Sequence, residues 1–297
     1  MNNFKLKADT VFVPAINGEC VIRLAEPGDR KDLISISRTI WEGHDYLPQI
    51  MDKWISEPYF IVCEFRGRVI ACLKLSLLPD NVLWFEGLRV HGRFQGKGIA
   101  TLMNRFAMGI AVELKKLNPP LSFEFCTYYK NAESLHLTQK VGFEVVQNCY
   151  QLDKRGVRDT KKPKILKDYD MSIFSALGDF IPLGWQALHN APASLAFIRK
   201  HAVVFQTPQS IYLLGGVIDK HITFLTPPPA DLKPELAFYQ HFHGSRRKYG
   251  IVLSPRFVSS LPLLSKHGFN FWDEEKEPVA NMYVLKMAED RISALDQ

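Results

Sequence analysis

The chain has 297 residues, of which 46% are hydrophobic and 23% charged, and its formal net charge is +6. This composition predicts a globular protein with one large or two smaller domains. No apolar stretch approaches the roughly 20 residues of a membrane span, and the amino terminus lacks the apolar core of a signal peptide. The five cysteines are odd in number and lack metal-ligand spacing, which favours reduced core thiols and no metal site. We therefore expect a soluble cytoplasmic protein, and its net charge permits nucleic-acid binding without favouring it.

The first half of the chain alternates strand-like and helix-like segments. Runs of β-branched and aromatic residues predict strands at 20–24, 60–65, 69–78, 82–90, 122–127 and 143–152. Helical spacing predicts helices after Asp29, around 50–54, at 99–117 and at 131–140. Asp29 is placed to cap the first helix, and Gly87 indicates a β-bulge in the strand at 82–90.

A short basic loop with two glycines lies between the strand at 82–90 and the helix at 99–117. Its pattern is Arg93-x-x-Gly96-x-Gly98, which is neither GxxxxGK[ST] nor GxGxxG. The first turn of the helix carries N–H groups without intrahelical acceptors, at the positive end of the helix dipole. The glycines let an oxyanion approach, so the loop is suited to phosphate.

This loop resembles the acetyl-CoA loop of the GNAT acetyltransferases. A second motif, Asn131-x-x-Ser134-x-x-Leu137-x-x-Lys140-x-Gly142-Phe143, is similar to the helix that flanks the CoA arm in this family. The resemblance covers about residues 21–152 and implies an α/β (α+β) GNAT fold with a mixed central sheet. It also implies that acetyl-CoA is the co-substrate. The residues expected at acetyl-CoA are Leu88, Arg89, Val90, Arg93, Gln95, Gly96, Lys97, Gly98, Ile99, Ala100 and Asn131.

Glu86 is the candidate general base. Strand alternation places Trp84, Glu86, Leu88 and Val90 on one face, where burial would raise the pKa of the carboxyl toward a base's working range. The resemblance supports this role, because GNAT enzymes often carry a glutamate on this strand to deprotonate the amine. The alternative is a structural carboxylate paired with an arginine.

The proton donor for the CoA thiolate is open. Many GNAT proteins have a tyrosine four residues before the glycine of the Gly-Phe pair, where this chain has Thr138. Tyr128 and His136 are the candidate catalytic residues in its place, and Tyr129 or water are further alternatives.

The segment WEGHDYLP at 41–48 is the candidate acceptor site. In the family, the loop between the first two helices lines the acceptor pocket. The expected substrate-binding residues are Trp41, Glu42, His44, Asp45 and Tyr46. They suit a small cationic or aromatic amine, whereas the alternative is a structural turn with both aromatic residues in the core.

This segment, with WISEP at 54–58 and EGLRV at 86–90, is more particularly similar to the vertebrate histidine N-acetyltransferase group. That likeness implies the α-amino group of histidine or a similar amino acid as acceptor. Asp45 or Glu42 would then lie near the cationic end of the substrate.

The second half of the chain echoes the first. Residues 154–169 predict a basic connector between a catalytic domain at 1–153 and a second domain at 170–297. Lys266-His267-Gly268-Phe269 repeats Lys140-Val141-Gly142-Phe143, but no Arg-x-x-Gly-x-Gly loop follows residue 98. We infer a degenerate GNAT-like half without a CoA loop, with coincidence as the alternative.

These features predict an acetyl-CoA-dependent N-acetyltransferase that acts on a small amine by direct transfer in a ternary complex. The alternatives are a protein or peptide N-acetyltransferase and a non-catalytic acyl-CoA sensor. No metal, nucleic-acid or membrane partner is expected, and the oligomeric state is open.

Overall fold

The computed structural model describes residues 7–154, 164–216, 221–232, 249–271 and 279–294. The chain divides into two compact units, residues 1–124 with 287–297 and residues 125–286. Within the described ranges, no helix has both the length and the apolar composition needed to cross a membrane. The domain limits predicted from the sequence remain a proposal.

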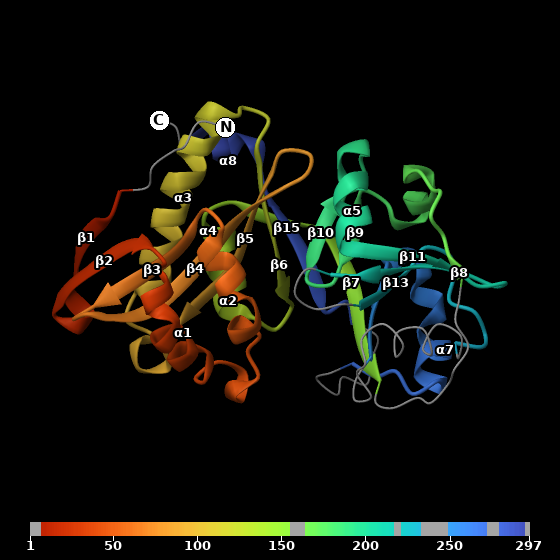
Figure 1. The fold of residues 1–297 in the computed structure, drawn as a ribbon, viewed down its shortest axis with the longest axis horizontal. Coiled ribbons are helices and arrows are strands. Elements are labelled where there is room, and N and C mark those ends of the chain that lie inside the picture. Colours follow the sequence, from red (N-terminus) through yellow and green to blue (C-terminus); the bar gives the residue numbers. More distant parts are fainter. Residues whose placement is uncertain (1–6, 155–163, 217–220, 233–248, 272–278, 295–297) are drawn as a thin grey trace. The chain divides into compact units, whose positions relative to one another are not determined.

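The first unit contains a sheet whose strands neighbour one another in chain order. They are β1 (Asp9–Val13), β2 (Gly18–Leu24), β3 (Phe60–Phe65), β4 (Arg68–Leu78), β5 (Val82–Val90) and the beginning of β6 (Ser122–Tyr128). β1 to β5 pair antiparallel, and β5 pairs parallel with β6, which makes the sheet mixed (Figure 1). β3 and β4 consist mostly of buried residues, as expected of central strands.

Residues with left-handed backbone form the two turns beside β4. Arg66 and Gly67 have φ of 51° and 71°, and Asp80 and Asn81 have φ of 62° and 56°. Consecutive positive φ angles match the right-handed twist of the strands they join. The strands predicted at 60–65, 69–78 and 82–90 are confirmed, and they pair as successive antiparallel neighbours.

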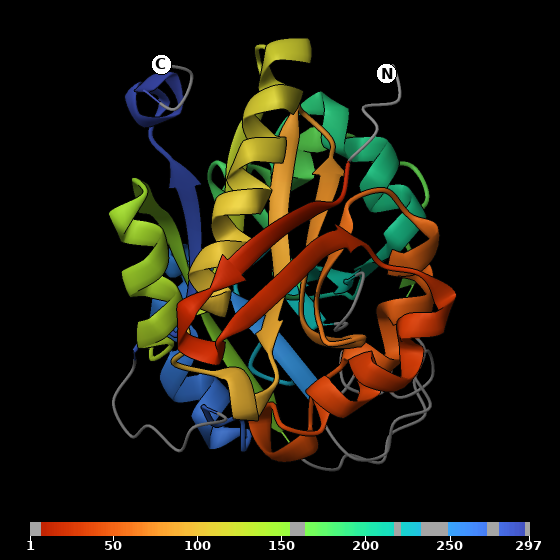
Figure 2. The ribbon, with the colours of Figure 1, turned by 90° about the vertical axis from the view of Figure 1, so that its left-hand side faces the viewer.

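Helices cover both faces of this sheet. They are α1 (Arg30–Ser37), α2 (Leu47–Ser56), α3 (Ile99–Leu117) and α8 (Glu289–Ala294), with the 3-10 turns η1 (Pro14–Ile16), η2 (Pro27–Asp29), η3 (Trp41–Gly43) and η4 (Gly92–Phe94). Figure 2 shows α3 on one side of the strands and α1 with α2 on the other. β5 adjoins two connecting segments. One joins α1 to α2, and the other joins β5 itself to α3.

Asp29 does not cap α1, contrary to the prediction. Its carboxylate accepts two hydrogen bonds from Arg23, each 2.8 Å long, and one from the Glu26 amide. No side chain caps the beginning of α1. The bidentate, charge-assisted bonds to the guanidinium hold the carboxylate away from the helix amides.

The second unit contains a mixed sheet of its own. In spatial order its strands are the rest of β6, β15 (Met282–Met287), β7 (Phe143–Lys154), β14 (Tyr249–Leu253), β13 (His221–Phe224), β12 (Ile211–Gly215), β11 (Ala202–Gln206) and β8 (Lys164–Ile165). β9 (Phe180–Leu183) and β10 (Gln186–His189) form a separate antiparallel pair. The helices are α4 (Ala132–Lys140), α5 (Leu195–His201) and α7 (Leu261–Lys266), with η5 (Met171–Leu177), η6 (Pro192–Ser194) and η7 (Pro255–Ser260).

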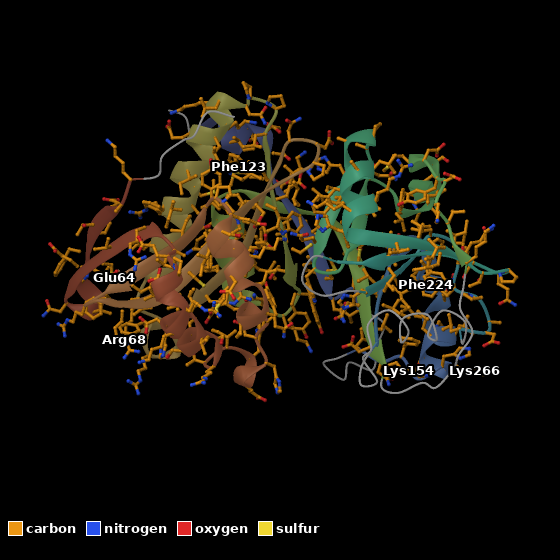
Figure 3. The ribbon with its side chains drawn as sticks, in the orientation of Figure 1. Glu64, Arg68, Phe123, Lys154, Phe224 and Lys266 are labelled. Atoms are coloured by element: carbon orange, nitrogen blue, oxygen red, sulfur yellow. The ribbon has the colours of Figure 1, made fainter. Side chains whose placement is uncertain are left out.

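The two Lys-x-Gly-Phe segments adopt similar local structures. Each lysine ends a helix, and Gly142 and Gly268 follow with φ of 98° and 80°. This left-handed glycine is a common way for a helix to end. At the second copy, the Lys154 ammonium donates to the His267 carbonyl; Figure 3 labels Lys154 and Lys266.

Candidate functional site

β5 contains a bulge at Gly87 and Leu88. Glu86 and Arg89 pair with β4 residues that are only two positions apart, so two residues of β5 lie opposite one residue of β4. Gly87 has φ of 74°, a conformation that side chains with a Cβ rarely adopt. The bulge predicted from this glycine is confirmed.

The bulge changes which side chains share a face, and it corrects the alternation predicted from the sequence. Glu86 and Arg89 lie opposite residues of β4 that share one face, so Arg89 joins the face of Glu86. Trp84 stays on this face, but Val90 does not. Strict alternation of side chains between the two faces fails here, because the extra residue at the bulge moves each later side chain of β5 to the opposite face. Leu88, within the bulge, has an exposed side chain.

Gly87 also lies in close contact with α2. A Cβ built at this position would be 2.8 Å from two ring carbons of Trp54 and 3.1 Å from Nη1 of Arg89. The absence of a side chain therefore lets the indole pack directly on the bulge.

We expect Gly87→Ala to destabilise the protein by about 2–4 kcal/mol, because the methyl group overlaps Trp54 and the left-handed φ disfavours alanine. The measurement is the free energy of unfolding of the full chain in urea. Gly109→Ala in α3 is the matched control, since a Cβ there meets nothing within 4 Å. That substitution should be neutral or slightly stabilising. Equal stability of the two variants would contradict the packing described for Gly87.

Glu86 is half-buried and tightly held. Its Oε1 accepts a hydrogen bond of 2.6 Å from the Ser76 hydroxyl of β4. Lys74, which is also on β4, lies directly opposite Glu86. Burial raises the pKa of the Glu86 carboxyl, while the Ser76 hydrogen bond and the charges of Lys74 and Lys53 oppose that rise. A carboxylate with a raised pKa that still ionises has the properties of a general base.

Arg89 and Asp45 form a buried ion pair that fastens the segment between α1 and α2 to β5. Nε and Nη2 of Arg89 each donate to Asp45 at 2.7 Å, and the two side chains are 4% and 0% exposed. The guanidinium carbon lies 4.4 Å from the ring centroid of Tyr46, 5.8 Å from that of Trp41 and 6.0 Å from that of Trp54. The charge of Asp45 is thus directed at Arg89 within the protein, where it holds this arrangement. Its role at the cationic end of the acceptor stays a prediction.

The segment from Trp41 to Gly43 has an unusual backbone. Three successive residues have positive φ, 44°, 56° and 84°, and two of them are not glycine. Left-handed backbone at ordinary residues is strained and is found at binding sites. Trp41 is 61% exposed, so the alternative that places it in the core is wrong; Glu42 and His44 are exposed as well.

The loop between β5 and α3 exposes its glycines and its backbone. Gly96 and Gly98 have φ of 69° and 79°, and Gly98 is the N-cap of α3. The Leu102 amide makes the first helical bond, to the Gly98 carbonyl, and the first turn has no acidic side chain. The amides of Ile99 and Ala100 lie in that first turn, where an α-helix has no intrahelical acceptors. The arrangement favours an anion.

The other loop residues that were predicted to contact the cofactor lie next to the beginning of α3. Arg93 and Lys97 are exposed and add positive charge. Gln95 holds the end of β5, because its Nε2 donates to the Val90 carbonyl at 3.1 Å.

Tyr128, Asn131, His136 and Thr138 belong to the second unit. Asn131 caps α4 by accepting a hydrogen bond from the Ser134 amide at 3.2 Å. The Thr138 hydroxyl donates to the Ser134 carbonyl of its own helix at 2.7 Å. Tyr128 is half-buried and His136 exposed. Their roles stay predictions.

Three residues around Glu86 and the bulge, Lys74, Ser76 and Trp54, were not predicted from the sequence. The first two could have been found by counting back from the turn at 79–81, because the hairpin pairs 78 with 82 and alternate residues then face Glu86. Trp54 contacts the bulge from a separate helix, and no sequence pattern gives that contact.

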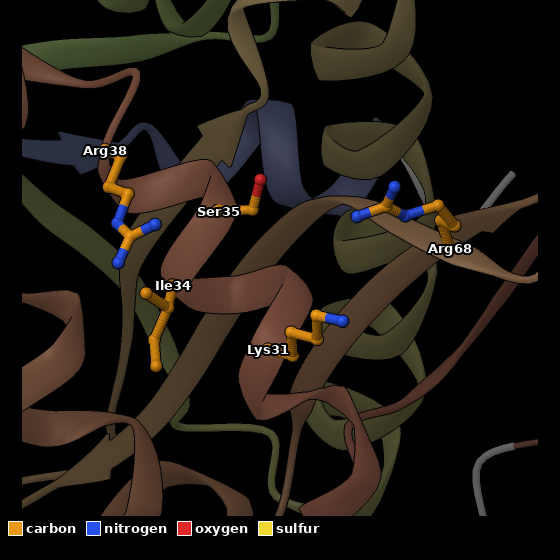
Figure 4. Close-up of a pocket in the computed structure, with 5 residues that line it drawn as sticks. All are labelled: Lys31, Ile34, Ser35, Arg38 and Arg68. Carbon is orange, nitrogen blue, oxygen red and sulfur yellow. The ribbon is translucent and has the colours of Figure 1, made fainter.

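A hollow of about 510 Å³ lies beside α1 (Figure 4). Its lining residues are Lys31, Ile34, Ser35, Arg38 and Arg68. None of them is a predicted site residue, and Arg68 is paired with Asp32 at 3.0 Å. In the ranges that the structure describes, no group of three or more His, Cys, Asp or Glu side chains is placed to hold a metal ion.

Residues 30–143 match the model of the Acetyltransferase (GNAT) family. These residues form a segment of the GNAT family type. The predicted resemblance is thereby confirmed, and the family implies acetyl-CoA as co-substrate. The match contains the acceptor segment, the bulged strand and the glycine loop.

Two curated relatives that match part of this chain are histidine N-acetyltransferases. The one from Xenopus tropicalis is 33% identical over 106 residues, which is 35% of this chain and 33% of the relative. The one from Oreochromis niloticus is 31% identical over 86 residues, 28% of this chain and 26% of the relative. The matched part thus spans a third or less of either relative.

The likeness in fold extends over nearly the whole chain. A GCN5-related N-acetyltransferase from Sphaerobacter thermophilus matches 91% of this chain and 95% of its own, with a TM-score of 0.61 and 13% identity. The predicted α/β GNAT fold with a mixed sheet is confirmed.

Proposed function

We propose that this chain is an acetyl-CoA-dependent N-acetyltransferase that acts on the amine of a small molecule. The observation that carries the proposal is the half-buried Glu86 at the β5 bulge, on the face that meets the aromatic segment between α1 and α2. The same strand leads into the glycine loop and the first turn of α3, which has no acidic side chain. A base and an anion-binding loop are thus built on one short stretch of chain.

The loop would bind the co-substrate. The backbone amides at the beginning of α3 would hold the pyrophosphate, and Arg93 and Lys97 would add positive charge. The main chain of Leu88 and Val90 would orient the thioester. These interactions fix the position of the acetyl group, which replaces a bimolecular encounter by a reaction between held groups.

Glu86 would act on the acceptor. It takes a proton from the ammonium form of the amine, directly or through water, and the freed nitrogen lone pair attacks the thioester carbonyl carbon. The C–N bond forms, the nitrogen of the adduct loses a second proton to solvent, the C–S bond breaks, and the leaving thiolate receives a proton. Tyr128 and His136 remain the proposed donors of that proton.

We further propose an amino acid as the acceptor, with the α-amino group of histidine as the first candidate. Trp41 offers an exposed indole face, and Glu42 and His44 offer polar contacts beside it. The partial similarity to two histidine N-acetyltransferases supports this choice of substrate.

A sensor that binds acyl-CoA without turnover is the second candidate. The Thr138 hydroxyl, at the position where many GNAT proteins have a tyrosine, is bonded to the backbone of its own helix. A short side chain engaged in this way is a poor proton donor for a thiolate.

The deciding experiment measures CoA release from acetyl-CoA with free amino acids, polyamines and short peptides, together with calorimetric binding of CoA. We expect turnover with an amino acid such as histidine. CoA binding without turnover on any amine would overturn the enzyme and favour the sensor. Turnover on peptides alone would overturn the small-amine acceptor.

A further inference from the structure

Lys74 is a buried lysine in the middle of β4. The residue is 1% exposed, and its Nζ donates to the Pro58 carbonyl at 2.6 Å and to the Leu75 carbonyl at 3.0 Å. A carboxylate oxygen of Glu57 lies 3.6 Å from the same nitrogen. An ammonium group has three donors and no acceptor, and three oxygens surround this one. These contacts fix the nitrogen in position. Burial lowers the pKa of the Lys74 ammonium, and the charges of Glu57 and Glu86 oppose that fall and favour the charged form.

This cation lies beside the proposed base. Lys74 and Glu86 are directly opposite each other on paired antiparallel strands, so their side chains leave the sheet on the same face. The Ser76 hydroxyl, also on this face, holds Oε1 of Glu86. β4 thus supplies both a hydrogen bond and a positive charge to the carboxylate.

Charged and titratable groups from the other elements also act on Glu86. α2 contributes Lys53, and Glu57 follows at the end of that helix, 3.6 Å from Lys53. The segment between α1 and α2 contributes the Tyr46 phenol. On β5 itself, Arg89 is neutralised by Asp45. Of the two lysines, Lys74 is the more deeply buried, so solvent screens its charge less.

Packing alone does not account for a lysine at this position. An apolar side chain of similar length could fill the space without three oxygen partners, and replacing buried ion pairs by apolar residues is often neutral or stabilising. A fixed ammonium opposite a half-buried carboxylate has an electrostatic effect that an apolar side chain lacks.

We propose that Lys74 is a positioning residue of the transfer site, whose fixed ammonium keeps the Glu86 carboxylate ionised without contacting the substrate. This inference rests on the proposed function, in which Glu86 is the base. Lys74 acts through Glu86 alone. It thereby counteracts the burial that would otherwise hold the proton on the carboxyl at neutral pH.

Two substitutions that change the charge near Glu86 in opposite directions test the proposal. Lys74→Met removes the positive charge and should raise the pKa of Glu86 by about one unit. Glu57→Gln removes a negative charge but keeps an acceptor for Lys74, so it should lower the pKa of Glu86. Lys53→Met is the matched control, because this lysine is 44% exposed and its removal should shift the pKa by only a few tenths of a unit. Should Lys74→Met fail to fold, Lys74→Gln carries the test, because it removes the charge and keeps a donor for the Pro58 and Leu75 carbonyls.

The pKa is measured by carbon NMR of the full chain with labelled glutamate carboxyls, and the Glu86 signal is assigned by its loss in Glu86→Gln. Opposite shifts in the two variants support the proposal, and an unchanged Glu86 titration in both overturns it. The acid limb of the pH–rate profile should move with the NMR value. Shifts in the NMR titration of a protein without transferase activity would sustain the electrostatic role and reject the proposed function.

Discussion

Replacing Glu86 by glutamine is expected to lower kcat/KM for the amine by about 10²- to 10⁴-fold, the usual contribution of a general base. The substitution preserves the shape of the side chain, and an amide oxygen can still accept the Ser76 hydrogen bond that holds the carboxylate. The loss of rate would therefore reflect the lost basicity. The loop that would bind CoA is separate from this side chain, so the Kd for CoA should stay the same. Steady-state kinetics and calorimetry measure the two quantities.

The pH dependence sharpens this prediction. Burial raises the pKa of Glu86, so the rate of the unmodified protein should fall, as pH is lowered, at a pH above the ordinary range of a carboxyl. This acid limb should disappear in Glu86→Gln. Glu113→Gln, on the exposed side of α3, is the matched control and should leave the profile unchanged. An undiminished rate in Glu86→Gln would remove Glu86 from the mechanism.

Asp45→Asn is expected to be the most destabilising of these substitutions, by about 3–5 kcal/mol. It leaves the Arg89 guanidinium buried without its anionic partner, among three aromatic rings. The free energy of unfolding in urea, followed by tryptophan fluorescence, measures the effect. Asp52→Asn is the control, because Asp52 pairs with Arg30 at the surface, where the side chains are 58% and 54% exposed. Its loss should cost less than about 1 kcal/mol.

A double substitution separates the ion pair from the shape of the segment. Arg89→Met removes the buried charge, so combining it with Asp45→Asn should recover much of the stability that Asp45→Asn loses. If the two losses simply add, the destabilisation comes from packing and not from an uncompensated charge.

Local pattern was sufficient to predict the parts of the site that lie close together in the sequence. The strand, the glycine loop and α3 are consecutive, and Gly96 and Gly98 mark the loop by their conformational freedom. Gly87 likewise predicted the bulge, since a glycine within an apolar strand commonly marks one.

Contacts between distant segments could not be predicted from the sequence. Asp45 and Arg89 are 44 residues apart, and their pairing depends on the way α1 and α2 lie on the sheet. The bulge was predicted, but the placement of Arg89 on the face of Glu86 was not. Strand periodicity assumes that successive side chains always point to opposite faces, and the bulge breaks that rule. Asp29 shows a similar limit, since the competing partner Arg23 is on another element.

The left-handed backbone at residues 41–43 limits which substitutions the proposed acceptor segment can take. The exposed side chains at 41, 42 and 44 can be varied in a library while Asp45 keeps the segment anchored to Arg89. Asparagine, aspartate and glycine suit the φ of 56° at position 42, whereas β-branched residues do not. Gly43, with φ of 84°, should be left as glycine. Position 41, with φ of 44°, carries the same restriction as position 42. A library that respects these three positions samples new recognition chemistry on an unchanged backbone.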